Sequence, residues 1–192
     1  MIRDAGPGDR SAVAAMLARA FADDPAMSYI FPDPRDRAKR LPRLFALLFD
    51  EDAPGMRLVT GEARAATLWQ RPGTPAVGTL TLLRRAVPLV AALGTALPRA
   101  LRVADALDAH APSGRYWYLH IAGVDPAHQG RGLGGASIRE GLARAANDGL
   151  PAYLETATER NVGLYQSLGF VVTSEWSVPK GGPKFWSMLR AA

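Results

Sequence analysis

Apolar residues near the start of the chain recur every three or four positions, the spacing of one face of a helix. They are Val13, Met16, Leu17, Ala20 and Phe21. This pattern predicts a helix over 10–21, which the polar run ending at Asp24-Pro25 should stop. A short opening strand is predicted at Ile2–Ala5. A second helix is predicted at Asp36–Phe49, with Pro42 placing a kink or a boundary inside it.

The middle of the chain predicts a hairpin followed by a helical stretch. Arg57–Thr60 and Ala63–Gln70 read as two strands joined by a tight turn at Gly61-Glu62. Residues 77–108 read as helical, with breaks where proline and glycine occur. These breaks are expected at Pro88, Gly94 and Pro98.

The remaining stretch alternates between strand and helix patterns. The predicted strands are Tyr116–Val124, Ala152–Thr156, Phe170–Val178 and Lys184–Leu189, and the predicted helices are Gly132–Asn147 and Arg160–Leu168. This order implies a mixed sheet covered by helices, an α/β (α+β) fold. We expect one domain over residues 1–192, with a helical insertion at about 77–112.

Composition limits the kinds of protein that this chain can be. Of its 192 residues, 48% are hydrophobic and 21% are charged, which suits a compact domain. The chain has no cysteine, so disulfides, thiolate metal sites and a cysteine nucleophile are excluded. A reducing cytoplasm is compatible with this composition, and we expect a cytoplasmic protein. The longest apolar region, Ala86–Leu97, is shorter than the roughly 20 residues that a bilayer requires, so no membrane partner is expected.

The formal net charge is +5, which suits either nucleic acid or an anionic cofactor. The densest basic run is interleaved with leucines and a phenylalanine. This is the pattern of an amphipathic helix whose basic residues lie on the solvent-exposed face. It comprises Arg35, Arg37, Lys39, Arg40 and Arg43. Neither a zinc-knuckle spacing nor an aromatic RNA-binding signature is present, so we expect no nucleic-acid partner. No metal-ligand cluster is apparent either.

A glycine-rich loop follows the strand that ends at Val124 and precedes a predicted helix. Four of the six residues in 130–135 are glycine, which lets the backbone approach a ligand closely. Free amides at the head of the helix would bind phosphate oxygens, and Arg131 could add a charged contact. A helix-capping turn is the structural alternative. A dinucleotide loop is a second alternative, because Glu155 lies near the spacing of its acidic partner.

The residues Gln129-Gly130-Arg131-Gly132-Leu133-Gly134 match the Gln/Arg-x-x-Gly-x-Gly/Ala signature of an enzyme family. The match continues at Asn161, Leu164-Tyr165 and Leu168-Gly169-Phe170 in the usual order. The C-terminal half thus resembles the GNAT family of N-acetyltransferases. The resemblance implies a splayed, mixed, mostly antiparallel sheet flanked by helices, with acetyl-CoA as cosubstrate in the gap.

The resemblance also implies which residues bind acetyl-CoA. The pantetheine arm would pair with the strand backbone at Ala122, Gly123 and Val124, with a bulge or divergence at Gly123. The Val124 N–H would face the oxyanion. Further cofactor contacts are implied at Gln129, Gly130, Arg131, Gly132, Leu133, Gly134, Gly135 and Asn161.

Three residues are candidates for proton transfer. Tyr165 matches the family tyrosine that acts as general acid, and a core tyrosine is the alternative. His120 would lie on the strand face toward the gap and could relay a proton through water, or it could be an ordinary core histidine. Glu155 is the rival base, and it could also bind a substrate ammonium or form a structural ion pair.

Substrate contacts are expected from residues 21–31 and from the middle of the chain. The candidates are Asp24, Tyr29, Trp69 and Trp117, which could frame an aromatic or cationic amine. We expect a small-molecule amine, including antibiotic-like ones, as acceptor. The rivals are acetylation of a protein N-terminus or lysine, a non-catalytic acetyl-CoA-binding domain and, more distantly, a nicotinamide oxidoreductase. The sequence leaves a monomer and a homodimer open.

Overall fold

Residues 1–73 form three strands and three α-helices. The structure is a computed structural model that describes residues 1–73 and 87–192. The elements are β1 (Ile2–Asp4), α1 (Arg10–Ala20), α2 (Pro25–Ile30), α3 (Pro34–Glu51), β2 (Arg57–Thr60) and β3 (Ala65–Gln70). The predicted strands and the first helix are confirmed. The helix α2 was missed. Of the two expectations for Pro42, the boundary is wrong, because α3 continues through this residue.

The missed helix α2 begins where the chain was expected only to stop. The Asp24 side chain accepts hydrogen bonds from the main-chain N–H groups of Ala26 (2.9 Å) and Met27 (3.0 Å), and Pro25 occupies the first helical position. An aspartate cap followed by proline is a helix start signal. Asp24 and Pro25 therefore begin α2, a few residues after α1 ends at Ala20.

The C-terminal half alternates as predicted. Its elements are α5 (Leu97–His110), β4 (Trp117–Val124), α6 (Leu133–Ala145), β5 (Ala152–Thr156), α7 (Val162–Ser167), β6 (Val171–Ser177) and β7 (Lys184–Arg190). Short 3-10 turns lie at η1 (Pro7–Asp9), η2 (Gly94–Ala96), η3 (Pro126–His128), η4 (Ala146–Asp148) and η5 (Glu159–Asn161).

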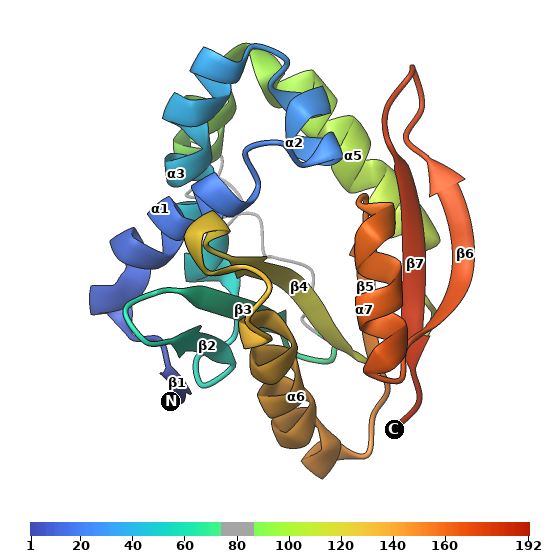
Figure 1. The fold of residues 1–192 in the computed structure, drawn as a ribbon. Coiled ribbons are helices and arrows are strands. Elements are labelled where there is room, and N and C mark those ends of the chain that lie inside the picture. Colours follow the sequence, from blue (N-terminus) through green and yellow to red (C-terminus); the bar gives the residue numbers. More distant parts are fainter. Residues whose placement is uncertain (74–86) are drawn as a thin grey trace.

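The strands form one seven-stranded sheet in the order β1-β2-β3-β4-β5-β7-β6. Every neighbouring pair is antiparallel except β4 and β5. That parallel pair is short, since only Trp117↔Ala152 and Tyr118↔Tyr153 are in register. Beyond them β4 and β5 diverge, as Figure 1 shows. The expected splayed, mostly antiparallel sheet is confirmed.

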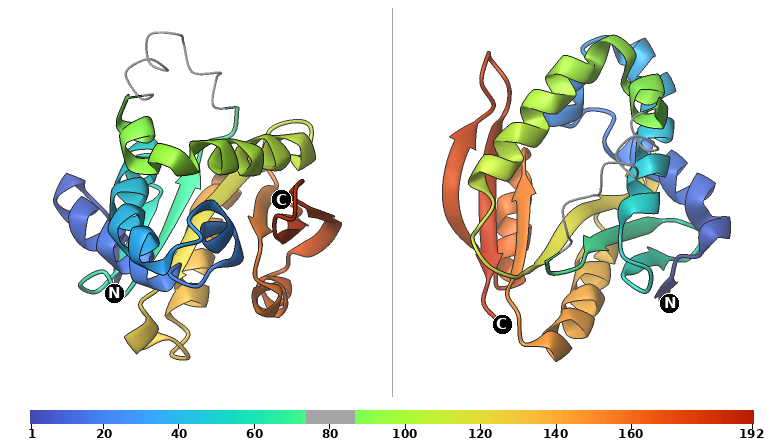
Figure 2. Two further views of the ribbon diagram at one scale, coloured as in Figure 1. Left: turned by 90° about the horizontal axis from the view of Figure 1, so that it is seen from above. Right: turned by 180° about the vertical axis from the view of Figure 1, so that it is seen from behind.

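Helices cover both faces of the sheet, with a separate apolar core under each (Figure 2). Helices α1 and α3 lie on one face, and α6 and α7 lie on the other. Close packing requires glycine at two places. A Cβ at Gly123 would come within 2.5 Å of Leu17 on α1, and one at Gly141 of α6 would come within 2.5 Å of the Trp69 ring. These glycines let both helices approach the sheet.

The helical run that includes α5 is longer than the apolar region noted in the sequence. It extends over Val87–His110, 24 largely apolar residues that include the turn η2. By length and composition alone, this run is long and apolar enough to cross a membrane. The expectation that the apolar region is too short, which was based on Ala86–Leu97, is therefore wrong. In the fold it packs against α2, with Val103 and Ala106 in the core. The predicted helical residues 77–86 lie outside the described residues.

Candidate functional site

The glycine-rich loop between β4 and α6 has the conformation that its sequence predicts. Gly130 and Gly132 adopt positive φ angles of 75° and 74°, the left-handed region that favours glycine. A Cβ built on either would meet nothing within 4 Å, so the loop is open on that side. Gly132 is the N-cap of α6, and Arg131 is exposed.

The amides at the head of α6 are free to bind an anion. The first hydrogen bond at this end runs from the Ala136 N–H to the Gly132 carbonyl oxygen at 3.0 Å. The preceding N–H groups of Gly134 and Gly135 therefore have no acceptor within the helix. The partial positive charge of the helix end lies at the same place. Free amides and a positive helix end are the features that bind phosphate oxygens in proteins.

The edge of β4 that faces β5 carries unused main-chain groups. The Asp125 N–H donates to the Arg64 carbonyl oxygen on the β3 side at 2.9 Å. Because successive N–H groups of a strand point to opposite sides, the N–H groups of Val124 and Ala122 point away from β3, toward β5. Pairing with β5 has already ended at Tyr118, so these groups have no strand partner.

A bulge does occur in β4, but its position differs from the expected one. Leu68 pairs with Ile121 and Trp69 with Leu119, so His120 is the extra residue. Gly123, where a bulge or divergence was expected, pairs regularly with Ala66. Its need for glycine comes from α1 instead, as described above.

Tyr165 lies on α7, on the far side of the gap between β4 and β5, and is 7% exposed. Its ring contacts Phe170 edge-on, with centroids 6.1 Å apart. Burial, together with the charge of Asp24, raises the pKa of Tyr165 to about 12. The phenol therefore keeps its proton throughout the neutral range.

His120 is held by two polar side chains from other parts of the chain. Its Nδ1 atom lies 2.9 Å from Oδ1 of Asp52 at the end of α3 and 3.1 Å from the amide nitrogen of Gln70 on β3. Burial favours the neutral ring, but the charge and hydrogen bond of Asp52, with the charges of Glu51 and Glu155, outweigh it and raise the pKa of His120. Asp52 was missed, because nothing near it in sequence indicates a partner 68 residues away.

The Asp52 carboxylate determines which ring nitrogen of His120 carries the proton. A carboxylate can only accept, so a neutral His120 bonded to it has its proton on Nδ1. The Gln70 amide would then present its oxygen to the same N–H, since amide orientation follows the hydrogen-bond network. The Nε2 atom keeps its lone pair and can accept a proton.

Glu155 follows Tyr153 by two positions on β5, so both side chains lie on one face of the strand. Burial raises the pKa of Glu155, against the opposing effects of the Tyr153 and Tyr118 hydroxyls and the charge of His120. Its Oε2 atom is inaccessible to solvent and has no hydrogen-bond partner among the described residues. Tyr118 links this group to His120, with ring centroids 5.5 Å apart.

Residues 76–170 match the sequence model of the Acetyltransferase (GNAT) family. The matched range includes the glycine loop, the β4 edge, Glu155 and Tyr165. This part of the chain is therefore similar to GNAT-family acetyltransferases.

Known proteins resemble this chain in sequence and in fold. L-amino acid N-acyltransferase MnaT of Escherichia coli is 36% identical over 78 residues, which are 39% of this chain and 44% of that protein. The chain thus spans less than half the length of this relative. A histone acetyltransferase HPA2-related structure from Corynebacterium glutamicum has a TM-score of 0.69 at 22% identity, covering 100% of this chain and 96% of the other. Arylalkylamine N-acetyltransferase 2 from Aedes aegypti has a TM-score of 0.65 at 13% identity, covering 100% and 98%.

The four residues that were predicted to contact the substrate have different surroundings. Trp69 is 0% exposed against α6, and Trp117 is 7% exposed with its ring N–H donating to Asp148 at 2.9 Å. Both tryptophans lie in the core on the α6 face, so their side chains are buried and not exposed to a substrate. Asp24 caps α2 and accepts a hydrogen bond from Thr158 at 3.4 Å. Tyr29 donates to the carbonyl oxygen of Pro179 at 3.3 Å.

Asn161 ends the turn before α7 and makes no capping hydrogen bond. The remaining histidines have structural partners. His110 stacks on Trp176 with ring centroids 4.2 Å apart, and His128 lies 3.8 Å from Asp125. Among residues 1–73 and 87–192, no group of three or more acidic or histidine side chains could hold a metal ion.

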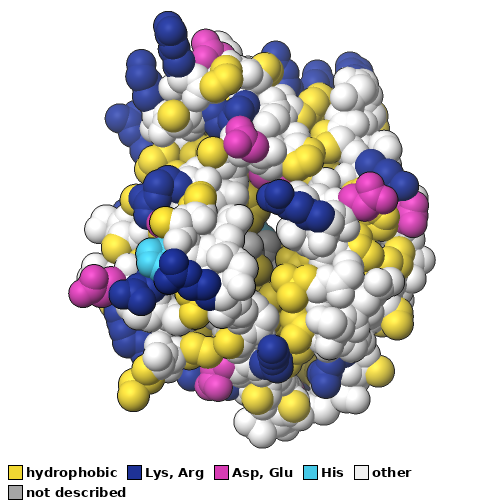
Figure 3. Space-filling model, viewed as in Figure 1, with side chains coloured by type: hydrophobic (Ala, Val, Ile, Leu, Met, Phe, Trp, Pro, Cys, Tyr) yellow, Lys and Arg dark blue, Asp and Glu magenta, His cyan; other side chains and the backbone are white. Residues whose placement is uncertain are grey.

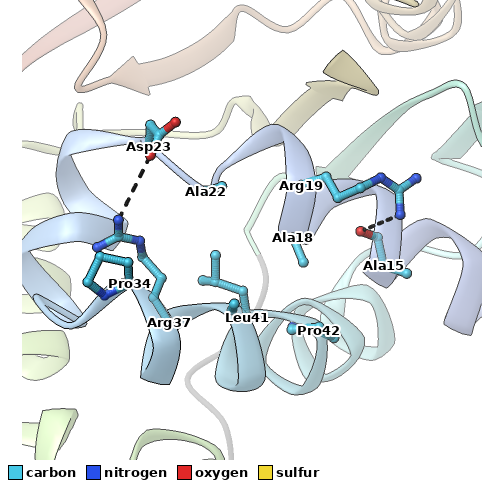
Figure 4. A pocket seen from close by; sticks show the side chains of 10 residues that line it. Ala15, Ala18, Arg19, Ala22, Asp23, Pro34, Arg37, Leu41 and Pro42 are labelled. Atoms are coloured by element: carbon cyan, nitrogen blue, oxygen red, sulfur yellow. Dashed lines mark hydrogen bonds and ion pairs between the residues drawn. The ribbon is translucent and has the colours of Figure 1, made fainter. Parts of the chain in front are cut away.

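A surface pocket of about 380 Å³ lies between α1 and α3 (Figure 4). Its wall includes the Arg37 guanidinium, 3.9 Å from the Asp23 carboxylate. The pocket is lined by Ala15, Ala18, Arg19, Ala22, Asp23, Pro34, Arg37, Ala38, Leu41 and Pro42. None of the predicted site residues is among them. This pocket is therefore separate from the residues that were predicted to form the site.

Proposed function

We propose that the chain is an N-acetyltransferase that transfers the acetyl group of acetyl-CoA to a primary amine of a small molecule. The observation that carries this proposal is the free amide cluster at the head of α6, beside the unpaired edge of β4 and across the gap from Tyr165. The match of residues 76–170 to the GNAT family and the splayed sheet support it. Direct attack by the amine needs no covalent nucleophile, in keeping with the absence of cysteine.

The loop fits the pyrophosphate of acetyl-CoA. Phosphate oxygens would accept hydrogen bonds from the amides of Gly134 and Gly135, and the helix end favours their negative charge. The open space beside Gly130 and Gly132 leaves room for this approach. Gln129, Arg131 and Leu133 would complete the cradle, and Asn161 would contact the cofactor from the next crossover.

The free edge of β4 would bind the pantetheine arm and the thioester. The N–H and C=O groups of Ala122 would pair with the amides of the arm, as a further strand would. The Val124 N–H, pointing into the gap, would donate to the carbonyl oxygen as negative charge develops on it. Gly123 brings the strand close to α1 and thereby sets the position of this edge.

Proton transfer needs an acceptor for the amine proton and a donor for the departing thiolate. We assign the acceptor to Nε2 of His120, reached directly or through water, because Asp52 holds the proton on Nδ1. Tyr165 would donate to the thiolate, since its pKa of about 12 keeps it protonated at neutral pH. Glu155, whose pKa is raised by burial, is the alternative acceptor.

The acceptor amine can be sought with a thiol-release assay. The run Gly149–Thr156 and the turn Val178–Pro183 resemble puromycin N-acetyltransferase, so puromycin belongs in the panel. Arylalkylamines, polyamines and L-amino acids complete it, the last because of the MnaT relative. Amine-dependent release of CoA, with a product heavier by one acetyl group, would support the proposal. Binding of acetyl-CoA without release by any primary amine would indicate a binding domain instead.

A further inference from the structure

Side chains on one face of β4 and β5 form a continuous polar set beside the point where the strands diverge. Asp52 contacts His120 at 2.9 Å, the His120 and Tyr118 rings lie 5.5 Å apart, and the Tyr118 and Tyr153 rings lie 5.9 Å apart. Glu155 is the next residue along β5 whose side chain lies on the same face as that of Tyr153. The Tyr153 hydroxyl donates to Ser187 Oγ at 3.0 Å, which fixes this end of the set.

Two carboxylate oxygens in this set are buried and unsatisfied. Oδ2 of Asp52 and Oε2 of Glu155 have no hydrogen-bond partner among the described residues, and the Asp52 side chain is 0% exposed. Such atoms are costly to bury unless something pairs with them. The pairing group must be a hydrogen-bond donor, because an ionised carboxylate can only accept.

The described residues supply little positive charge to this set. No described lysine or arginine forms an ion pair with Asp52 or Glu155, and His120 is the basic group in contact. The Arg57 guanidinium donates to the main-chain oxygen of Asp52 at 2.6 Å and not to its carboxylate. The protein as a whole is positively charged, in contrast to this acidic set. Its net charge is +5, and basic side chains are spread over the face in Figure 3.

We propose that the acceptor carries a second cationic group besides the amino group that is acetylated, and no carboxylate, and that Glu155 binds this second cation. This inference rests on the proposed function. The attacking amino group must lose its proton and its charge to react with the thioester, so it cannot retain an ion pair through the reaction. A second ammonium or guanidinium keeps its charge and its pairing with Glu155. Short diamines are the simplest members of this class.

Three acceptors of equal chain length test the proposal on the wild-type protein. Cadaverine, n-pentylamine and δ-aminovalerate present a primary amino group with a cationic, neutral or anionic tail, and either amino group of cadaverine can react. We expect kcat/KM for cadaverine, per reacting amino group, to exceed that for n-pentylamine by about tenfold or more, the effect of one partly buried ion pair, with δ-aminovalerate lowest. In Glu155→Gln, this ratio of cadaverine to n-pentylamine per amino group should fall toward one. Glu62→Gln, on the exposed turn before β3, is the control and should keep the wild-type ratio.

The outcomes separate this inference from the proposed function. If no primary amine releases thiol, the transferase proposal fails and the charge inference fails with it. If amines are acetylated but cadaverine is no better than n-pentylamine, or δ-aminovalerate is the best of the three, the transferase proposal stands and the charge inference is overturned. A ratio that Glu155→Gln leaves unchanged would refute the assignment of the second cation to Glu155.

Discussion

Oδ1 of Asp52 and Nδ1 of His120 lie 2.9 Å apart, although 68 residues separate them in the chain. The carboxylate belongs to the C-cap residue of α3, and His120 is the extra residue of the bulge in β4. A buried carboxylate bonded to one nitrogen of an imidazole fixes its tautomer and raises its basicity. Asp52 is thus a positioning residue for the proposed proton acceptor, and this role can be tested by pH.

Asp52→Asn should move the acidic limb of the kcat/KM profile to lower pH. His120 accepts a proton only in its neutral form, so activity rises as pH passes its pKa, which in the folded wild type is raised above 6.5. Removing the Asp52 charge lowers that pKa, while Glu51 and Glu155 remain. Rates measured across the acidic and neutral range, together with an NMR titration of the imidazole, check this. An unmoved limb with lowered activity would leave Asp52 a purely structural residue.

Tyr165→Phe should lower kcat far more than acetyl-CoA affinity. The change removes only the hydroxyl that would protonate the thiolate, and a general acid typically contributes about a hundredfold or more. The Kd for acetyl-CoA should stay within about twofold, because the ring packing remains. Steady-state kinetics and calorimetry give both quantities. Wild-type turnover in the variant would remove Tyr165 from the acid role.

Gly132→Glu should abolish binding of acetyl-CoA. It adds a carboxylate at the head of α6, where the proposed pyrophosphate lies, and like charges there should cost about a hundredfold or more in affinity. Gly149→Glu is a matched control at the other end of the same helical segment, also with a positive φ angle and open space. Calorimetry should find binding retained in the control. Equal affinities of the two variants would exclude this loop as the phosphate site.

Gly141→Ala should destabilise the fold, whatever the function. Its Cβ would lie 2.5 Å from the Trp69 ring, which is fully buried, and such overpacking typically costs about 1–3 kcal/mol. Gly163→Ala is the helical control, because its Cβ meets nothing within 4 Å and alanine favours a helix. Urea unfolding should therefore order the proteins as Gly141→Ala, wild type and Gly163→Ala, from least to most stable. A Gly141 variant as stable as wild type would show that α6 can shift.

Local signals predicted most elements because each is encoded within a few residues. The ends of β5 were predicted without error, and the loop before α6 was recognised from glycines that do adopt positive φ angles. The helix α2 was missed although its signal, Asp24 before Pro25, was visible. That dipeptide was interpreted only as the end of α1, and it also caps the next helix.

The sequence by itself determined the strands and most of the helices, together with the open, glycine-rich backbone of the loop before α6, since periodicity and backbone freedom are local properties. Only the tertiary structure decided which polar groups meet and which aromatic residues are buried. Trp69 and Trp117 became core residues, and Asp52 became the partner of His120. The reason is that contacts across the sheet depend on strand register, and a single extra residue at His120 changes which side chains lie together.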